Sequence, residues 1–185
     1  MIHNHDRSGW IGASDTYTVM SRWSTKTFDR FWRVKLGLDN SHFENTAMKT
    51  GTAFEHKILD AIGVSRRDRQ IRRRDLRLRV NLDGEDKDTI YEVKTYGKDG
   101  FLVSKAYWMQ AQVEMFATGK KLVIVAYRLE ADDYGNWLRP IDPQRLSYHP
   151  VEYDREWVKE QYLPRLCYLA MCLREGRWPR ADFDS

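Results

Sequence analysis

The order of the predicted secondary-structure elements indicates an α/β protein, with a mixed central sheet flanked by helices. Helices come first, a strand hairpin follows near the middle of the chain, and a helix then leads to an apolar strand and a last helix. This order favours one sheet with helices on both faces. At 185 residues, 42% of them hydrophobic, the chain is predicted to form a single domain over residues 1–185.

The first part of the chain is predicted to be helical. Ser14 or Asp15 can cap a short first helix, and a second helix is expected over residues 26–36. A third is expected over residues 45–62, where apolar residues recur at helical spacing. Glu55 lies one turn before apolar residues of that helix, so its carboxylate needs a partner. A metal-bound water would be one such partner, and a neighbouring lysine or arginine would be the alternative.

Residues 76–96 have the pattern of a β-hairpin. Apolar and polar residues alternate up to Asp83, and a second strand is expected over residues 89–96. The chain is expected to turn directly after Asp83. A hairpin of this kind brings Asp83, Glu92 and Lys94 together at one edge.

These three residue types suit the hydrolysis of a phosphodiester. Asp83 and Glu92 would repel each other unless a cation lay between them, and oxygen ligands suit Mg²⁺ or Mn²⁺. The backbone carbonyl of Val93 is a candidate further ligand. Such a metal polarises the phosphodiester and lowers the pKa of a bound water, while Lys94 orients that water and offsets negative charge. A surface hairpin with an ordinary Glu–Lys pair is the alternative.

Positive charge is concentrated just before Asp83. The net charge is +4 and the sequence pI is about 9.0, with a run of arginines between residues 66 and 79. We expect part of this run to form a strand that contacts DNA phosphates, with Arg77 and Arg79 nearest the site. Asp68 and Asp75 interrupt the run, which indicates that some of its arginines are paired internally.

A helix beginning at Lys105 is expected after the hairpin. Lys105, Trp108 and Gln112 share one of its faces, whereas Gln110 and Glu114 share another. The two glutamines therefore cannot both reach the same atom. Lys105 and Trp108 are predicted to contact DNA.

The last third of the chain is predicted to hold an apolar strand over residues 121–129, a turn-rich connection over residues 132–150 and a helix kinked at Pro164. Cys167 and Cys172 are expected to be free thiols of a reducing compartment. No apolar run is long enough to span a membrane, and the N-terminus lacks the hydrophobic region of a signal peptide. A cytoplasmic location is expected.

Four blocks of sequence resemble the YqaJ-like viral recombinase and lambda-exonuclease family of PD-(D/E)xK nucleases. They are IGASD from Ile11, GTAFEHKI from Gly51, LDG…YEVK from Leu82 to Lys94, and YWMQAQVEMFATG from Tyr107. The resemblance extends over most of residues 7–127. It implies a restriction-endonuclease-like core and the activity of a Mg²⁺-dependent 5′→3′ exonuclease on double-stranded DNA, working in phage-type recombination in a bacterial cell.

The resemblance also implies roles for individual residues. It places the metal-binding carboxylates on Asp83 and Glu92, and the active-site lysine on Lys94. It places a further metal ligand on Glu55, and the glutamine that faces the active site on Gln112.

A site for a DNA 5′-phosphate is implied at Arg7 and Ser14. The chain departs from the family pattern at two neighbouring positions. Leu82 replaces the proline of the family name, and Asn81 replaces a small hydroxyl residue found in a member of the family, which makes 5′-phosphate recognition less secure. Family members often form a ring trimer around DNA and work with a single-strand annealing protein, so both are implied for this chain.

Two other functions are compatible with the same residues. The fold also serves endonucleases of restriction, repair and branch cutting, which cleave closed circles instead of degrading DNA from an end. A DNA- or protein-binding module without activity is the other alternative. The intact set of Asp83, Glu92, Lys94 and Glu55 argues against that module.

Overall fold

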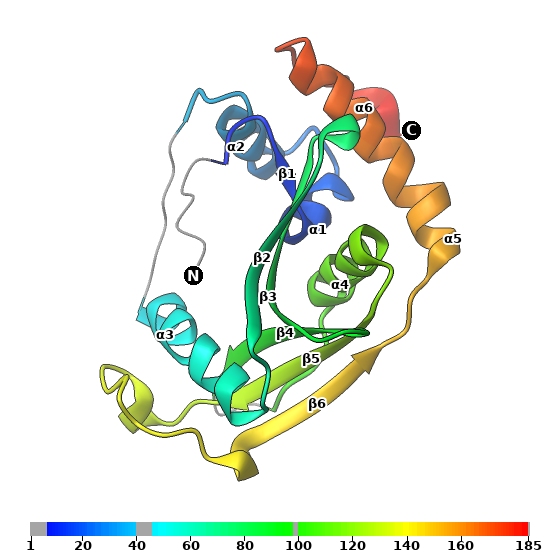
Figure 1. The fold of residues 1–185 in the computed structure, drawn as a ribbon. Helices are drawn as coiled ribbons and strands as arrows, with labels where there is room; N and C mark the ends of the chain where they lie inside the picture. The colour runs from blue at the N-terminus through cyan, green and yellow to red at the C-terminus, as the bar shows by residue number, and fades with distance from the viewer. Residues whose placement is uncertain (1–6, 40–45, 98–99, 185) are drawn as a thin grey trace.

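The described part of the chain folds around a six-stranded mixed sheet with helices on both faces (Figure 1). The computed structural model describes residues 7–39, 46–97 and 100–184. The strands are β1 (Ile11–Gly12), β2 (Arg66–Arg73), β3 (Leu78–Glu85), β4 (Thr89–Tyr96), β5 (Lys121–Arg128) and β6 (Leu146–Val151). The α-helices are α1 (Thr16–Val19), α2 (Lys26–Lys35), α3 (Thr46–Ala61), α4 (Lys105–Thr118), α5 (Arg155–Trp157) and α6 (Leu163–Arg174).

The sheet has the order β1-β3-β4-β5-β6, and β2 pairs with the other edge of β3. β1 runs parallel to β3 and β4 runs parallel to β5, whereas the other pairs are antiparallel. The predicted α/β class with a mixed sheet between helices is therefore confirmed.

Two hydrophobic clusters cover the two faces of the sheet. The larger one packs α4, α2 and α6 against the sheet and includes Leu78 and Ile124, both fully buried. The smaller one lies under α3 and includes Phe54, Ile58 and Val125. Because successive side chains of a strand point to opposite faces, β5 contributes to both clusters. α3 and α4 are thereby fixed on opposite faces of the sheet (Figure 1).

The hairpin turns later than the sequence pattern predicts. Pairing of β3 with β4 continues to Glu85 and Ile90, so Asp83 lies within β3. The carboxylate of Asp86 closes the turn by accepting hydrogen bonds from the backbone N–H groups of Asp88 (2.8 Å) and Thr89 (2.7 Å). An aspartate that bonds its own following backbone favours a turn at that point. The predicted turn directly after Asp83 is wrong.

The helices and strands otherwise follow their predicted order, except that Ile11–Gly12, expected at the opening of the first helix, forms the short strand β1 beside β3. Two further differences lie near the C-terminus. The turn-rich connection contains the edge strand β6, which the pattern did not predict. The last helix changes to a π-helical turn over Val158–Tyr162, just before Pro164. Proline has no N–H to donate, so the regular bonding pattern is interrupted there. Position 45, the predicted start of the third helix, lies outside the described residues.

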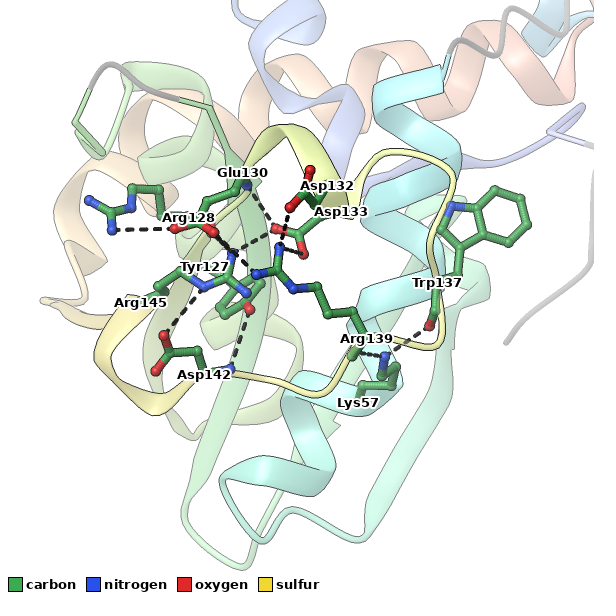
Figure 2. A network of polar contacts seen from close by, with 10 residues as sticks. All are labelled: Lys57, Tyr127, Arg128, Glu130, Asp132, Asp133, Trp137, Arg139, Asp142 and Arg145. Atoms are coloured by element: carbon green, nitrogen blue, oxygen red, sulfur yellow. Dashed lines mark hydrogen bonds and ion pairs between the residues drawn. The ribbon is translucent and has the colours of Figure 1, made fainter.

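A network of ion pairs holds the connection between β5 and β6 (Figure 2). The fully buried carboxylate of Asp133 accepts a hydrogen bond from Arg145 at 2.6 Å, and Arg139 approaches it at 3.4 Å. Lys57 of α3 donates to the backbone carbonyls of Trp137 (2.8 Å) and Arg139. The network therefore ties this connection to α3, the helix that carries the predicted ligand Glu55.

Two predictions for the whole chain can be compared with the structure. Cys167 is exposed, Cys172 is buried, and both are free thiols, as predicted. None of the helices in the described ranges is both long enough and apolar enough to cross a membrane.

Candidate active site

The candidate site lies where β3 and β4 separate (Figure 1). β3 pairs with β1 at its first two residues and with β4 at its last two, so residues 80–83 have no described strand partner on that edge. The side chain of Asp83 fills the opening. Its Oδ2 accepts a 2.8 Å hydrogen bond from the backbone N–H of Val93. The carboxylate therefore accepts the hydrogen bond that a backbone carbonyl of a paired strand would otherwise accept.

Glu92 and Lys94 lie on the face of β4 that α4 covers. Glu92 is 4% exposed, and its Oε1 accepts hydrogen bonds from Lys94 Nζ at 2.6 Å and from Gln110 Nε2 at 2.5 Å. The other oxygen, Oε2, is buried and has no hydrogen-bond partner among the described residues. The Lys94 ammonium also lies 5.0 Å from the ring centre of Tyr107. A buried carboxylate oxygen without a donor is suited to a cation.

Burial and neighbouring carboxylates raise the pKa of Asp83 and of Glu55 at this site. Burial, and then the charges of Glu92 and Glu55, raise the pKa of Asp83 well above its ordinary value. Burial, followed by the charges of Glu92 and Asp68, raises the pKa of Glu55 to about 7. Burial alone would lower the pKa of Lys94, but Glu92 and Asp83 raise it above its ordinary value, so the side chain stays an ammonium. Carboxyl groups that resist joint ionisation are those that a divalent cation would stabilise.

Two glycines let α3 bring Glu55 to the strands. A Cβ at Gly51 would lie 3.0 Å from Thr95 Oγ1 of β4, and a Cβ at Gly84 would lie 2.6 Å from Leu59 Cδ2 of α3. A larger residue at either position would require these neighbouring side chains to move. Because Gly51 and Glu55 are four residues apart, they lie on the same face of α3. The close packing of α3 against β4 therefore explains the glycine in the GTAFE block.

A second polar group extends the site on the α3 side. Within the described ranges, the group of three His, Asp or Glu side chains whose ligand atoms lie within 4.8 Å of one another is Glu55, His56 and Asp68. His56 Nε2 lies 2.9 Å from Asp68 Oδ2. Asp68 lies in β2 between Arg67 and Arg69, which pair with Gly84 and Leu82 of β3, and it has a φ of 55°. The sequence does not indicate that His56 and Asp68 belong to the site, because their approach depends on how β2 pairs with β3.

The prediction that Gln112 faces the active site is wrong. Its side chain is fully buried and bonds to the segment before α5. Nε2 donates to the carbonyl of Glu152 at 2.8 Å, and Oε1 accepts from the N–H of Asp154 at 2.7 Å. Gln112 therefore anchors the C-terminal segment to α4.

Gln110 takes the place expected for Gln112. Its Nε2 donates to Glu92 at 2.5 Å and to Glu114 Oε1 at 2.8 Å. Glu114 is fully buried, and its Oε2 has no described hydrogen-bond partner. The spacing of Gln110 and Glu114 shows in the sequence that they share a face, but it does not show which face of α4 meets β4.

The residues predicted to contact DNA have different surroundings. Trp108 packs against Trp157, with ring centres 4.9 Å apart, at the edge of the larger hydrophobic cluster. The ring is only partly buried, so DNA contact by Trp108 remains a prediction. Lys105 is exposed at the start of α4, and Arg77 lies with its guanidinium 6.0 Å from the ring centre of Trp10. DNA contact by Lys105 and Arg77 remains a prediction.

The arginines of β2 are partly paired, as their spacing with acidic residues indicated. The buried carboxylate of Glu85 contacts Arg69 at 2.7 Å, Arg66 at 3.3 Å and Lys120 at 2.6 Å. Against the effect of burial, Lys120 and Arg69 hold the pKa of Glu85 below its ordinary value. The strand therefore presents less free positive charge than its sequence indicates.

A basic pocket of about 310 Å³ adjoins the carboxylates. Arg7 and Ser14, the pair predicted to bind a 5′-phosphate, lie together there, with Arg7 Nη2 3.3 Å from Ser14 Oγ. Arg79 and Asn81 also line the pocket from β3, on the same face of that strand as Asp83. On the side of α4, its lining is Gln110 and Glu114. The pocket and the carboxylate site therefore share the wall formed by Gln110.

A buried ion pair forms the base of this pocket. Asp15 is 8% exposed and Lys35 is 3% exposed, with 2.5 Å between Oδ2 and Nζ. The other oxygen of Asp15 accepts from Arg7 at 2.7 Å, and Oδ2 also accepts from the N–H of Gly12 at 2.7 Å. Despite the effect of burial, Lys35 and Arg7 hold the pKa of Asp15 below its ordinary value. Asp15 thus positions Arg7 at the pocket. The sequence does not indicate that Lys35 belongs to this pocket, because a lysine at the end of an amphipathic helix is normally exposed to solvent.

The fold is of the restriction-endonuclease-like class, as comparison with solved structures shows. An alkaline exonuclease, LHK-Exo, from Laribacter hongkongensis superposes with a TM-score of 0.65 at 18% identity, over 91% of this chain and 90% of that one. A phage-related exonuclease from Haemophilus somnus superposes with a TM-score of 0.61 at 13% identity, over 89% and 92%. No family model matches the chain, and no curated protein matches its sequence. The predicted resemblance is thus confirmed at the level of the fold.

Proposed function

We propose that the protein is a metal-dependent deoxyribonuclease, and specifically a 5′→3′ exonuclease on double-stranded DNA that works in phage-type recombination. The observation that carries this proposal is the cluster of Asp83, Glu92 and Lys94 at the opening of the sheet, where one buried oxygen of Glu92 has no hydrogen-bond donor among the described residues. The exonuclease folds of the structural neighbours support it.

The donor set fits a hard divalent cation such as Mg²⁺, with Mn²⁺ as a substitute. Asp83 and Glu92 would hold it, with Glu55 and the backbone carbonyl of Val93 as further oxygen ligands. When bound, such a cation polarises the phosphodiester and lowers the pKa of a coordinated water. The raised pKa values of Asp83 and Glu55 support this assignment, because acids in this state gain from a nearby positive charge.

The side chains of the site have separate tasks in this proposal. Lys94 stays protonated and, held by Glu92 at 2.6 Å, offsets the charge that develops on the phosphate oxygens. Gln110 restrains Glu92 from the side of α4. The N–H of Val93 fixes the orientation of Asp83. Groups held in place in this way need little rearrangement when the substrate binds.

The basic pocket supports attack from a 5′ end. A terminal phosphate carries more negative charge than an internal phosphodiester, so a pocket with several cations favours phosphorylated ends. Arg7 and Ser14 would bind this phosphate, Arg79 would add charge, and Asn81 offers an amide donor. The ring trimer, the annealing-protein partner and the cytoplasmic location implied by the resemblance belong to the same proposal.

The proposal is tested by digesting linear duplex DNA in Mg²⁺ with one strand labelled at a time, with and without a 5′-phosphate, beside a closed circle. We expect loss of the 5′-ended strand, faster degradation of phosphorylated ends and an intact circle. Cutting of the circle would favour an endonuclease of this fold. DNA binding without cleavage in either Mg²⁺ or Mn²⁺ would favour a binding module.

A further inference from the structure

A second groove continues the basic pocket along α2. It has a volume of about 490 Å³ and shares Arg7, Asp15 and Lys35 with that pocket. The rest of its lining comes from one face of α2, namely Lys26, Thr27, Arg30, Phe31 and Val34. We call it the α2 groove. The pocket that contains Arg7 is therefore open on the side away from the carboxylates.

The charges of the α2 groove suit a polyanion. Lys26 and Arg30 are four residues apart on α2 and are exposed, and neither forms an ion pair with any residue in the described ranges. The one carboxylate of the lining, Asp15, is already paired with Lys35 and Arg7. The groove therefore presents positive charge that its own surroundings do not neutralise.

The apolar part of the lining favours a single DNA strand over a duplex as the occupant of the groove. Phe31 and Val34 are partly buried between the cations, and they form an apolar strip along the groove. A duplex hides its base faces, whereas a single strand offers bases to apolar and aromatic side chains and phosphates to cations. This combination favours one unpaired DNA strand as the occupant.

We propose that the α2 groove binds a single-stranded 5′ extension of the DNA substrate. In a blunt duplex the terminal phosphate would lie at Arg7, whereas in an extended one an internal phosphate would lie there and the extension would continue past it along α2. The enzyme then cuts extended ends near the junction and releases short oligonucleotides instead of single nucleotides. This inference rests on the proposed nuclease function and adds a substrate class to it.

The test compares blunt duplex DNA with a duplex that carries a short 5′ extension, both labelled at the 5′ end. The wild-type protein should release the label from the extended substrate as an oligonucleotide about as long as the extension. Arg30→Ala should slow cleavage of the extended substrate several-fold and leave the blunt substrate unchanged. Arg33→Ala is the matched control, because Arg33 is an exposed arginine of the same helix outside the groove.

Binding in EDTA, followed by fluorescence anisotropy, tests the groove without cleavage. Arg30→Ala should weaken binding of the extended duplex and reduce its salt dependence by about one unit of slope, while Arg33→Ala binds like the wild type. Release of single nucleotides alone from extended ends, or equal effects of the two substitutions, would overturn the proposal. A wild-type protein that binds extended DNA through Arg30 but cleaves neither substrate would support the groove and refute the nuclease.

Discussion

Replacing Glu55 by glutamine is expected to stabilise the metal-free protein at alkaline pH and to impair hydrolysis. Burial and the charges of Glu92 and Asp68 raise the pKa of Glu55 from 4.5 to about 7. A carboxyl group whose pKa is higher in the folded state destabilises the fold once it ionises. This cost is absent below the unfolded pKa, grows as the pH rises, and is complete above the folded pKa.

The magnitude follows from the size of the shift. A shift of this size corresponds to at most about 3 kcal/mol, and the partial exposure of the carboxyl reduces the expected effect to about 1–2 kcal/mol. For a chain of this length, such a gain raises Tm by about 2–8 °C. Glu55→Gln should therefore be more stable than the wild type at pH near 8 and about equally stable at pH near 4.5.

The assay is urea unfolding in EDTA at both pH values, followed by circular dichroism. Glu160→Gln is a matched control, because Glu160 is exposed and neutralising it should change little. Addition of Mg²⁺ should stabilise the wild type more than Glu55→Gln and so reduce the difference. A variant that is less stable than the wild type at pH near 8, or whose stability changes equally at both pH values, would contradict the raised pKa of Glu55.

Other substitutions separate structural from functional roles. Lys35→Met should destabilise the protein by about 3–5 kcal/mol in urea unfolding, because it leaves the buried carboxylate of Asp15 without its closest cation; an unchanged unfolding midpoint would contradict this. Gln112→Ala should cost about 1–3 kcal/mol of stability by removing two hydrogen bonds to backbone groups, with kcat per folded molecule unchanged. Gln110→Ala should instead lower kcat per folded molecule by about 10–100-fold, because Glu92 loses a hydrogen-bond donor that restrains it at the site. Equal behaviour of the two glutamine variants would contradict the assigned faces of α4.

Much of the fold follows from local patterns in the sequence. Alternation predicts the strands around Asp83, and Thr25 and Ser104 cap their helices as short hydroxyl side chains do. The edge strand β6 could not be predicted, because Pro150 within it is typical of a turn. At a sheet edge, however, a proline does not remove a needed ladder bond. Several acidic residues of the sequence could close the hairpin turn, and the register between β3 and β4 decides which of them does so.

The candidate site could be predicted only in part for a related reason. Asp83, Glu92 and Lys94 are close in sequence, so hairpin geometry alone brings them near one another. Asp68 and Lys35 approach the site through strand register and helix packing, which no local pattern specifies. Which of Gln110 and Gln112 faces the active site depends on which face of α4 packs against β4, and the sequence does not show this.

The most direct test of the account is Mg²⁺-dependent release of nucleotides from linear duplex DNA by the wild type and by Lys94→Met, with DNA binding measured on the same samples. We expect release by the wild type and a loss of activity of roughly a hundredfold or more in the variant, with DNA binding retained. Cleavage by Lys94→Met at the wild-type rate would contradict the assignment of the active site to Asp83, Glu92 and Lys94.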